Sequence, residues 1–347
     1  MCIDRVKMVL VGLNFGQHII AMQLLAGPGK QYIDLLGVYD LDTEKCARAA
    51  EKFGIKAYAS WDEILNDPKV EAVGLFTGPN GRAGLIRKII NAGKHVMTTK
   101  PFELDPDAAL KVLYEARDLG KVLHLNSPGP LPSAETAQAL EWIKEYDLGR
   151  QAAVHWETYA GYNEKADGSW YDDPVKCPVA PIFRLGIYAI NQLIRLCGEV
   201  EQVSVMHSRI RTGRPTPDNA ALSMLFKNGV IGNVYASFCV QNGQVYPNSL
   251  TLHYERGTIT VSPEEDAETV RMTLQALDAS GNRIDLVKHF DIDQVSGKYQ
   301  WGNFYNAVRS GPLPGEIAPE QIVNAIQVIQ AMSQAEKTGK NVSLNDL

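Results

Sequence analysis

The sequence is poor in the features that mark nucleic-acid-binding proteins and disulfide-rich secreted domains. It has 34 basic and 40 acidic residues, for a formal charge of -6, and no basic run that could neutralise a phosphate backbone. A nucleic-acid partner is therefore not expected. The cysteines are odd in number and have neither CxxC nor histidine spacing, which disfavours disulfides and structural zinc. They are Cys2, Cys46, Cys177, Cys197 and Cys239.

Membrane and targeting signals are also missing. The chain enters an apolar stretch at Val6 with no charged leader, apolar h-region or cleavage site before it, so we expect a cytoplasmic protein without a membrane partner. Four of the histidines lie far apart without ligand spacing, so no metal is predicted. They are His18, His207, His253 and His289.

What the sequence does have is enough apolar material for two domains. At 347 residues it is long for one hydrophobic core, and 45% of its residues are apolar. Residues 127–130 read Ser-Pro-Gly-Pro, which is typical of a crossing between domains. We therefore predict an N-terminal domain over residues 1–127 and a C-terminal domain over residues 128–347.

The first 127 residues alternate between strand and helix patterns, which predicts an α/β domain with a parallel, doubly wound sheet. The expected strands are continuous apolar runs, as in strands buried on both faces. The strands are expected at residues 6–11, 33–39, 70–76, 95–98 and 122–126, and the helices at 42–54, from 60, 80–92 and 105–120.

Beyond residue 150 long strands joined by short turns predict an α+β domain built on a large, mainly antiparallel sheet. The strands are expected at residues 152–159, 200–212, 220–226, 230–240, 250–254 and 270–277. One helix, 182–196, should cross a face of this sheet, and the other face should be open, which favours a homodimer or homotetramer. An amphipathic helix at about 319–338 is expected to pack back on the first domain.

A glycine-containing turn follows the first strand and precedes a helix. It reads Gly12-Leu-Asn14-Phe15-Gly16, a degenerate form of the dinucleotide-binding GxGxxG turn. Gly12 permits the tight turn, Asn14 tolerates positive φ, and Gly16 is expected to let backbone approach a pyrophosphate. Asp40, at the end of the second strand, can accept from both ribose hydroxyls and repel a 2′-phosphate. NAD is thus predicted as the cofactor, with NADP disfavoured.

A second candidate position is Lys100, which follows the strand at residues 95–98. Ligands of parallel sheets bind where the strands end, so this ammonium is placed for chemistry. The alternative is a solvated loop lysine.

Ordered motifs along the first domain resemble the glucose–fructose oxidoreductase/inositol dehydrogenase (Gfo/Idh/MocA) family. They are Val38-Tyr-Asp40, Lys52-Phe-Gly54, Trp61-Asp-Glu63-Ile-Leu, residues 73–80, residues 92–96 and Lys100-Pro101, and the likeness resumes at Gly186-Ile-Tyr188 and residues 332–342.

The resemblance implies a Rossmann domain, a second domain with an open-faced sheet, a nicotinamide nucleotide, and oxidoreduction of a sugar or cyclitol hydroxyl. It implies that Thr77, Pro79 and Asn80 lie along the cofactor. It also implies that Lys100, in the family's lysine-proline motif with Pro101, faces the substrate hydroxyl.

The departures from the family pattern cluster at the expected active site. Tyr188 occupies the acid/base position, but Arg184 stands four residues before it, where relatives commonly have aspartate. Thr99 replaces the glutamate before the motif lysine, Arg82 the usual histidine after the threonine-proline motif, and residues 178–180 the glycine-rich helix entry.

Two interpretations of these changes remain open. In one, Lys100 and Arg184 stabilise a tyrosinate at Tyr188 for acid–base catalysis, and Arg184 also clamps an acidic sugar substrate. In the other, the protein has kept its cofactor but lost efficient catalysis, and acts as a nucleotide- or sugar-binding regulator. A redox-neutral, NAD-dependent glycosidase or lyase also fits the family.

Three further residues are candidates for substrate contact. Trp170 lies in a segment that resembles a substrate-proximal loop, and it can stack on a sugar ring or simply belong to a polar turn. Asn126 ends the last strand of the first domain and can reach substrate. His155 can face the cleft or pack within the second sheet.

Overall fold

The computed structural model describes residues 3–347 apart from residues 163, 244–247, 266–267, 279 and 296. The chain divides into a first unit, residues 1–131 and 299–319, and a second unit, residues 132–298 and 320–347. Residues 299–319 thus group with the first unit, and the helix predicted at 319–338 groups almost entirely with the second. There Asn324 accepts a hydrogen bond from the Val200 amide at 2.9 Å.

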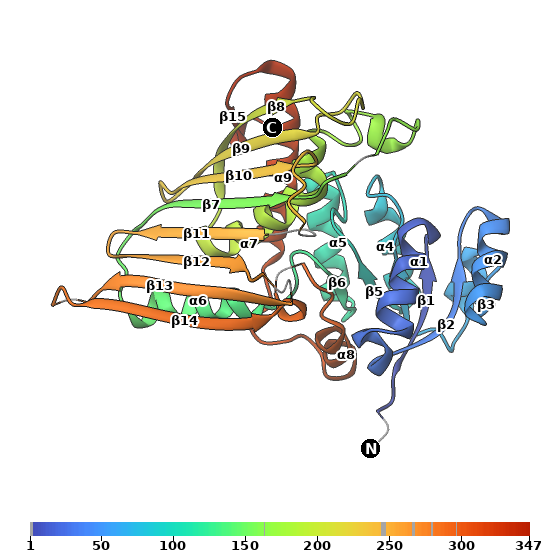
Figure 1. Cartoon of the computed structure of the whole chain (residues 1–347). Helices are drawn as coiled ribbons and strands as arrows, with labels where there is room; N and C mark the ends of the chain where they lie inside the picture. Colours follow the sequence, from blue (N-terminus) through green and yellow to red (C-terminus); the bar gives the residue numbers. More distant parts are fainter. Residues whose placement is uncertain (1–2, 163, 244–247, 266–267, 279, 296) are drawn as a thin grey trace. The chain divides into compact units, whose positions relative to one another are not determined.

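The first unit is built on six parallel strands in the order β3-β2-β1-β4-β5-β6, the predicted doubly wound arrangement (Figure 1). The central strands β1, β4 and β5 are almost wholly buried, as their continuous apolar runs require, whereas β2 is partly exposed and the edge strand β3 is exposed. They are β1 (Val6–Val11), β2 (Ile33–Tyr39), β3 (Lys56–Ala57), β4 (Ala72–Leu75), β5 (His95–Thr98) and β6 (Leu123–Leu125).

Side-chain caps fix several helices of the first unit. Asp42 accepts from the Lys45 amide and starts the second helix, which ends at Gly54 with φ 66°, and Asp105 caps the fifth. The helical segments are α1 (Leu13–Ile19), the π-helical turn η1 (Ile20–Leu25), η2 (Pro28–Gln31), α2 (Thr43–Phe53), α3 (Trp61–Asn66), α4 (Arg82–Asn91), α5 (Pro106–Asp118) and α8 (Trp301–Ser310). Helix α8 was not predicted from the sequence. It places Trp301 and Phe304 in the core around β1.

The second unit is built on nine strands in the order β14-β13-β12-β11-β7-β10-β9-β8-β15. Neighbours are antiparallel except β7 and β10, so the predicted mainly antiparallel sheet is confirmed. The strands are β7 (Gln151–Tyr159), β8 (Val200–Ser208), β9 (Asn219–Phe226), β10 (Ile231–Ser237), β11 (Asn248–Tyr254), β12 (Gly257–Pro263), β13 (Thr269–Leu277), β14 (Arg283–Asp291) and β15 (Val342–Ser343).

Helices cover one face of this sheet (Figure 1). The covered face is apolar: Trp156 of β7, Leu222 of β9 and Val234 of β10 lie side by side and are buried. The helical segments of the second unit are α6 (Ala134–Glu145), η3 (Trp170–Asp172), the π-helical turn η4 (Ile182–Gly186), α7 (Ile187–Cys197), η5 (Ile292–Gln294), α9 (Pro319–Thr338) and η6 (Leu344–Asp346). No helix in the described parts of the chain combines the length and apolar character needed to cross a bilayer.

One predicted strand is shorter than expected. The apolar pattern predicted residues 200–212, but β8 ends at Ser208, because the buried Asp218 carboxylate accepts from the amides of Ile210, Arg211 and Thr212. These hydrogen bonds replace the ladder of a strand and turn residues 209–217 into a loop.

Candidate functional site

The predicted cofactor residues of the first unit lie at the carboxyl ends of adjacent parallel strands. Gly12 follows β1, Asp40 follows β2, Thr77 lies two residues beyond β4, Lys100 two beyond β5, and Asn126 follows β6. One edge of the sheet therefore carries the glycine turn, a carboxylate and an amine, which is the arrangement that dinucleotide-binding sheets use.

The turn at Gly12 can be made only by glycine. Its φ is +90°, and an added Cβ would lie 2.8 Å from the backbone carbon and oxygen of Phe76. Gly16 has a packing role in addition to the one predicted for it. A Cβ there would lie 2.5 Å from Leu10 Cδ2, so Gly16 permits close packing of α1 on β1, and no pyrophosphate contact is needed to explain it.

The amino end of α1 suits an anion. Its first turn has no acidic residue, and its N-cap residue, Gly12, has no side chain with which to cap it. Asp40 lies against this end, since its Oδ2 accepts from the Leu13 amide at 2.7 Å. Asn14 Oδ1 accepts from Lys45 Nζ at 2.8 Å, and the Phe15 ring is 47% exposed. These residues fit a bound dinucleotide, since Gly12 has no side chain to block the turn and the Asp40 carboxylate lies beside it at the end of β2.

The loop that carries Lys100 is held by buried polar side chains. The Lys100 amide donates to Asn126 Oδ1 at 3.1 Å. Arg82, the first residue of α4 and only 2% exposed, donates to the carbonyls of Thr99 at 2.6 Å and Pro101 at 2.8 Å, and also to the carbonyl of Thr77. Asn126, predicted as a substrate contact, is itself 2% exposed and acts on the backbone of Lys100.

Pro79 and Asn80 lie between β4 and α4, in the turn that ends at Gly81 with φ +66°. The carbonyl of Pro79 accepts from the Arg82 amide at 3.3 Å. The buried guanidinium of Arg82 thus links this turn with the Lys100 loop, and sequence reasoning identified Arg82 only as a departure from the family pattern.

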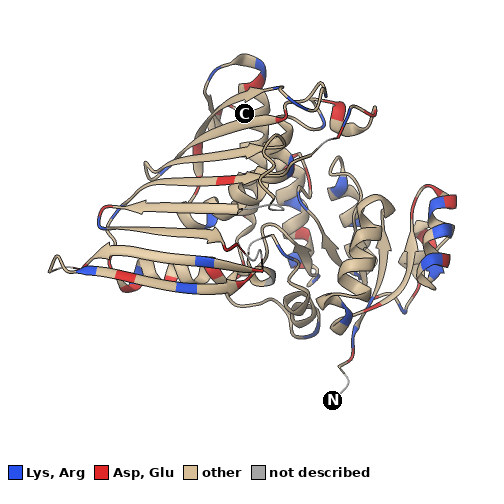
Figure 2. Ribbon diagram, in the orientation of Figure 1, with Lys and Arg blue, Asp and Glu red and all other residues tan. Residues whose placement is uncertain are grey.

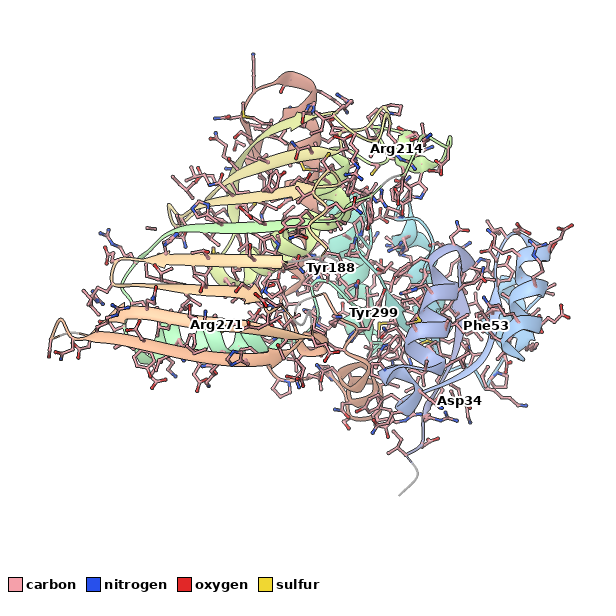
Figure 3. All side chains as sticks on the ribbon, in the orientation of Figure 1. Asp34, Phe53, Tyr188, Arg214, Arg271 and Tyr299 are labelled. Atoms are coloured by element: carbon pink, nitrogen blue, oxygen red, sulfur yellow. The ribbon has the colours of Figure 1, made fainter. Side chains whose placement is uncertain are left out.

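In the second unit, Tyr188 lies on α7 (Figure 3), and Arg184 lies one turn earlier, on the π-helical turn η4 that precedes α7. Widened turns of this kind are frequent at functional sites. Tyr188 is half-buried, and Gly297 packs against it so closely that an added Cβ would lie 2.9 Å from the ring.

Arg184 is engaged by a carboxylate from the same unit. Its Nη1 and Nη2 donate to Glu164 at 2.7 and 3.0 Å. Three rings lie around the guanidinium at 4.1 to 4.9 Å, those of Tyr162, Tyr171 and Phe238. The hydrogen bonds from Arg184 hold the pKa of the Glu164 carboxyl below its ordinary value.

A second arginine extends this network. Arg214 Nη1 donates to Asp172 at 2.6 Å and to Asp167 at 3.2 Å, and its Nη2 lies 3.8 Å from Glu164 (Figure 3 labels Arg214). Hydrogen bonds with Ser169 and then Arg214 lower the pKa of Asp167 to about 2. The loop between β7 and η4 is therefore fixed by two cations that the sequence alone did not connect.

The structure does not bring all predicted substrate residues together. Trp170 begins η3, tilted on Tyr171 at 4.1 Å and edge-on to Phe183 at 6.2 Å, and so belongs to the region around Arg184. His155 pairs with Asn233 in the sheet and is exposed, on the face opposite to that of the buried Val234, against which η4 packs. It therefore lies away from Arg184 and Tyr188.

Among the described residues no group of three or more histidine, cysteine, aspartate or glutamate side chains could hold a metal ion. A buried cation of the first unit is bound by backbone carbonyls. Lys94 Nζ donates to the carbonyl oxygens of Asp67 and Val70 at 2.8 and 2.9 Å.

Comparisons with known proteins give the same picture. Residues 6–127 match the family described as "Oxidoreductase family, NAD-binding Rossmann fold", and residues 136–260 match the "GFO/IDH/MocA C-terminal domain". Similar curated proteins include an oxidoreductase of Schizosaccharomyces pombe, 28% identical over 45% of this chain, and UDP-N-acetylglucosamine 3-dehydrogenase of Acidithiobacillus ferrooxidans, 24% identical over 60%. The matched segments span only 42% and 60% of those two relatives' own lengths.

Solved structures share the fold over nearly the whole chain. An oxidoreductase of Desulfitobacterium hafniense described as NADPH-dependent superposes with a TM-score of 0.78 at 15% identity, covering 99% of both chains. Levoglucosan dehydrogenase in complex with NADH and L-sorbose superposes with a TM-score of 0.74 at 18% identity, also covering 99% of both. With both domain families matched in order, the chain belongs to the GFO/IDH/MocA family of oxidoreductases, and its first unit is an NAD-binding Rossmann domain.

Proposed function

We propose that this protein is an NAD-dependent dehydrogenase that acts on a hydroxyl of a sugar, a cyclitol or a sugar derivative. The observation that carries the proposal is the edge of the first sheet, where Gly12, Asp40 and Lys100 follow β1, β2 and β5. Sugar-acting relatives, such as UDP-N-acetylglucosamine 3-dehydrogenase and 1,5-anhydro-D-fructose reductase of Ensifer adhaerens, support the substrate class.

In this proposal Gly12, Phe15 and the amino end of α1 hold the pyrophosphate, and Asp40 accepts from the ribose hydroxyls. Thr77, Pro79, Asn80 and Pro101 belong to the loops that line the cofactor. When bound, NAD supplies the hydride acceptor or donor. The chain's own task is to bind and orient the substrate carbon and to move one proton.

Lys100 is proposed to bind the reacting hydroxyl through its ammonium, and Tyr188 to exchange the hydroxyl proton. In the oxidation direction the alcohol loses a hydride from carbon and a proton from oxygen, and the proton passes to the tyrosine oxygen. Trp170 is proposed to offer its ring to a sugar face.

The ion pair of Arg184 changes one expectation. An unpaired guanidinium would both stabilise a tyrosinate and clamp a substrate carboxylate, but here each Nη of Arg184 donates to Glu164, whose charge offsets that of the arginine. An acidic substrate would meet this carboxylate beside the arginine, and a neutral substrate would not be repelled by it. We therefore propose a neutral sugar or polyol as the first substrate class to test.

The decisive experiment is a steady-state assay with NAD and a panel of neutral sugars, polyols and sugar acids, in which nicotinamide reduction is followed by absorbance. Lys100→Met and Tyr188→Phe should each lower kcat by about 100-fold or more, whereas NADH binding, measured by fluorescence titration, should persist. Two controls should retain turnover: Lys111→Met, at an exposed position of α5, and Tyr235→Phe, which loses only a hydrogen bond to Asn219.

The result also separates the alternatives. A protein that binds NADH but turns over no member of the panel would be a regulatory relative and not a dehydrogenase. A protein that keeps NAD through gel filtration and transforms a substrate without net NADH formation would be a redox-neutral enzyme.

A further inference from the structure

Arg82 is a buried cation whose guanidinium donates, among the described residues, to three backbone carbonyls: those of Thr99 and Pro101 in the Lys100 loop and that of Thr77 after β4. We propose that Arg82 and Glu103 are positioning residues that together fix the backbone on both sides of Lys100, and through it the place of the Lys100 amine. This inference rests on the role proposed for Lys100.

The guanidinium bonds flank Lys100 in the sequence. Nη1 donates to the carbonyl before Lys100, that of Thr99, at 2.6 Å, and to the carbonyl of Pro101 at 2.8 Å. With the Lys100 amide donating to Asn126 at 3.1 Å, each of the three consecutive residues 99 to 101 has one backbone group bonded to a side chain. A backbone held on both sides of Lys100 fixes the point from which its side chain extends.

Glu103 completes the connection from the other side. Its Oε2 accepts from the Ala83 amide at 2.8 Å, in the first turn of α4, and its Oε1 accepts from the Leu104 amide at 2.8 Å. Arg82 thus reaches from α4 to the Lys100 loop, and Glu103 reaches from that loop back to α4. The two contacts are reciprocal, so the loop cannot shift relative to α4 without losing both.

Arg82 is a buried cation, and the charge of Glu103 acts on it. Burial lowers the pKa of Arg82 to about 10, and the charge of Glu103 opposes that shift. Arg82 therefore remains a cation at neutral pH although it is only 2% exposed, and Glu103 is equally buried. Burying two charges is costly unless hydrogen bonds satisfy them, and here those bonds go to the backbone of the Lys100 loop and of α4.

Arginine is suited to this position by the shape of its donor group. The fork of the guanidinium reaches the Thr77 carbonyl through Nη2 and the Thr99 and Pro101 carbonyls through Nη1. A lysine side chain donates from one nitrogen only. A histidine, which relatives commonly have at this position, has two ring nitrogens. Two departures from the family pattern thus meet: arginine at position 82, and Thr99 in place of glutamate before the motif lysine. The arginine donates to the carbonyl of that threonine.

Lys94 provides a matched control for a general loss of stability. It too is a buried cation on two backbone carbonyls, those of Asp67 and Val70, but it lies before β5, whereas Lys100 lies after it. Lys94→Gln should therefore lower the melting temperature about as much as Arg82→Gln, without moving Lys100.

The test compares full-length wild type, Arg82→Gln, Arg82→Lys and Lys94→Gln by two readouts. The first is the rate at which the Lys100 amine reacts with an amine-specific acylating reagent, measured by mass spectrometry against Lys30 and Lys111 in the same sample. Arg82→Gln should change that relative rate by about threefold or more, and Lys94→Gln should not. The second is kcat, which should fall about 10- to 100-fold in Arg82→Gln at little-changed KM. Arg82→Lys should restore part of both.

The two readouts distinguish this inference from the proposed function. If wild type turns over no sugar, or if Lys100→Met keeps full activity, the proposed function fails, and the labelling result alone decides the positioning role. If Lys100 labelling and kcat in Arg82→Gln match those of Lys94→Gln, Arg82 only stabilises the fold and the inference is overturned.

Discussion

Arg184 and Glu164 form a two-point ion pair inside the second unit, with Nη1 2.7 Å from Oε2 and Nη2 3.0 Å from Oε1. The carboxylate comes from a loop 20 residues earlier in the chain and offsets the charge of the arginine.

This geometry predicts the cost of removing one partner. Glu164→Gln should lower the free energy of unfolding by about 1–3 kcal/mol, since it leaves the 13%-exposed Arg184 side chain without its anion. Urea unfolding measures the change. The double variant Glu164→Gln/Arg184→Met should recover part of the loss, because no unpaired charge then remains.

A surface pair gives the control for this measurement. Glu199 and Lys227 are 44% and 56% exposed, and Glu199→Gln should cost only about 0–1 kcal/mol. Equal losses for Glu164→Gln and Glu199→Gln would show that the Arg184 pair is an ordinary surface contact.

Much of the fold followed from sequence, for physical reasons visible in particular elements. Continuous apolar runs such as Val6–Val11 identify strands buried on both faces, and caps such as Asp42 and Gly54 mark the ends of α2. The sequence did not yield β14, because Arg283–Asp291 carries charges along an edge strand, or α6, because its start lies close behind the Pro-rich crossing. Both lack a continuous apolar run.

A candidate site residue could be predicted from the sequence only where its type and its place at the end of a strand were enough to single it out. Gly12, Asp40 and Lys100 each follow a strand and were found in that way. The partners Glu103, Glu164 and Arg214 were not, because each acts on residues at least 20 positions away through loops whose course depends on tertiary contacts. The available signal was an unexpected arginine at each of positions 82 and 184, because a buried guanidinium needs hydrogen-bond acceptors nearby.

Asp40 should determine the choice between NAD and NADP. Asp40→Asn keeps an oxygen that can accept from the Leu13 amide but removes the negative charge. NADH affinity should fall about tenfold while NADPH affinity holds or rises, as measured by calorimetry with each nucleotide. The control is Asp34→Asn at the start of the same strand, where the carboxylate pairs with Arg5. An unchanged preference in Asp40→Asn would remove Asp40 from the ribose site.

The open face of the large sheet should join two copies of the chain. Charged side chains are sparse on its central strands (Figure 2), and its exposed apolar residues include Met206, Leu225 and Ile231. Ile231→Asp should raise the dissociation constant of the dimer by about 100-fold, as measured by light scattering across a dilution series. Ile210→Asp, at an exposed loop position, should have no such effect. A monomeric wild type would rule out this interface.

Two glycines of the first unit should respond in opposite ways to the same substitution. Gly12→Ala forces a Cβ against the Phe76 backbone at φ +90°, so it should cost about 1–3 kcal/mol and abolish NADH binding. Gly84 lies within α4, where an added Cβ meets no atom within 4 Å, so Gly84→Ala should stabilise by about 0.5–1 kcal/mol. Thermal melting and NADH titration of both variants check this. A stable, NADH-binding Gly12→Ala protein would contradict the turn geometry.

His124 should make stability fall in mild acid. It lies on β6, edge-on to Phe304, and burial lowers its pKa to about 3, below the ordinary 6.5 that the unfolded chain retains. Between these values the unfolded state binds the proton and the folded state does not. The stabilisation is therefore complete above pH 6.5 and is lost as the pH falls toward 3, by up to about 1.4 kcal/mol per pH unit for this proton.

His124→Leu should reduce that slope, because an apolar side chain of similar size takes up no proton. Burial and then the charge of Lys121 lower the pKa of His95 to about 4, so part of the slope should remain in the variant. Urea unfolding at several pH values between 7 and 4 measures the difference, with His18→Gln at an exposed position of α1 as the control. Since Nε2 of His124 has no hydrogen-bond partner among the described residues, the variant should be about as stable as wild type at pH 7. An unchanged slope in His124→Leu would mean that the buried imidazole is not the group that titrates.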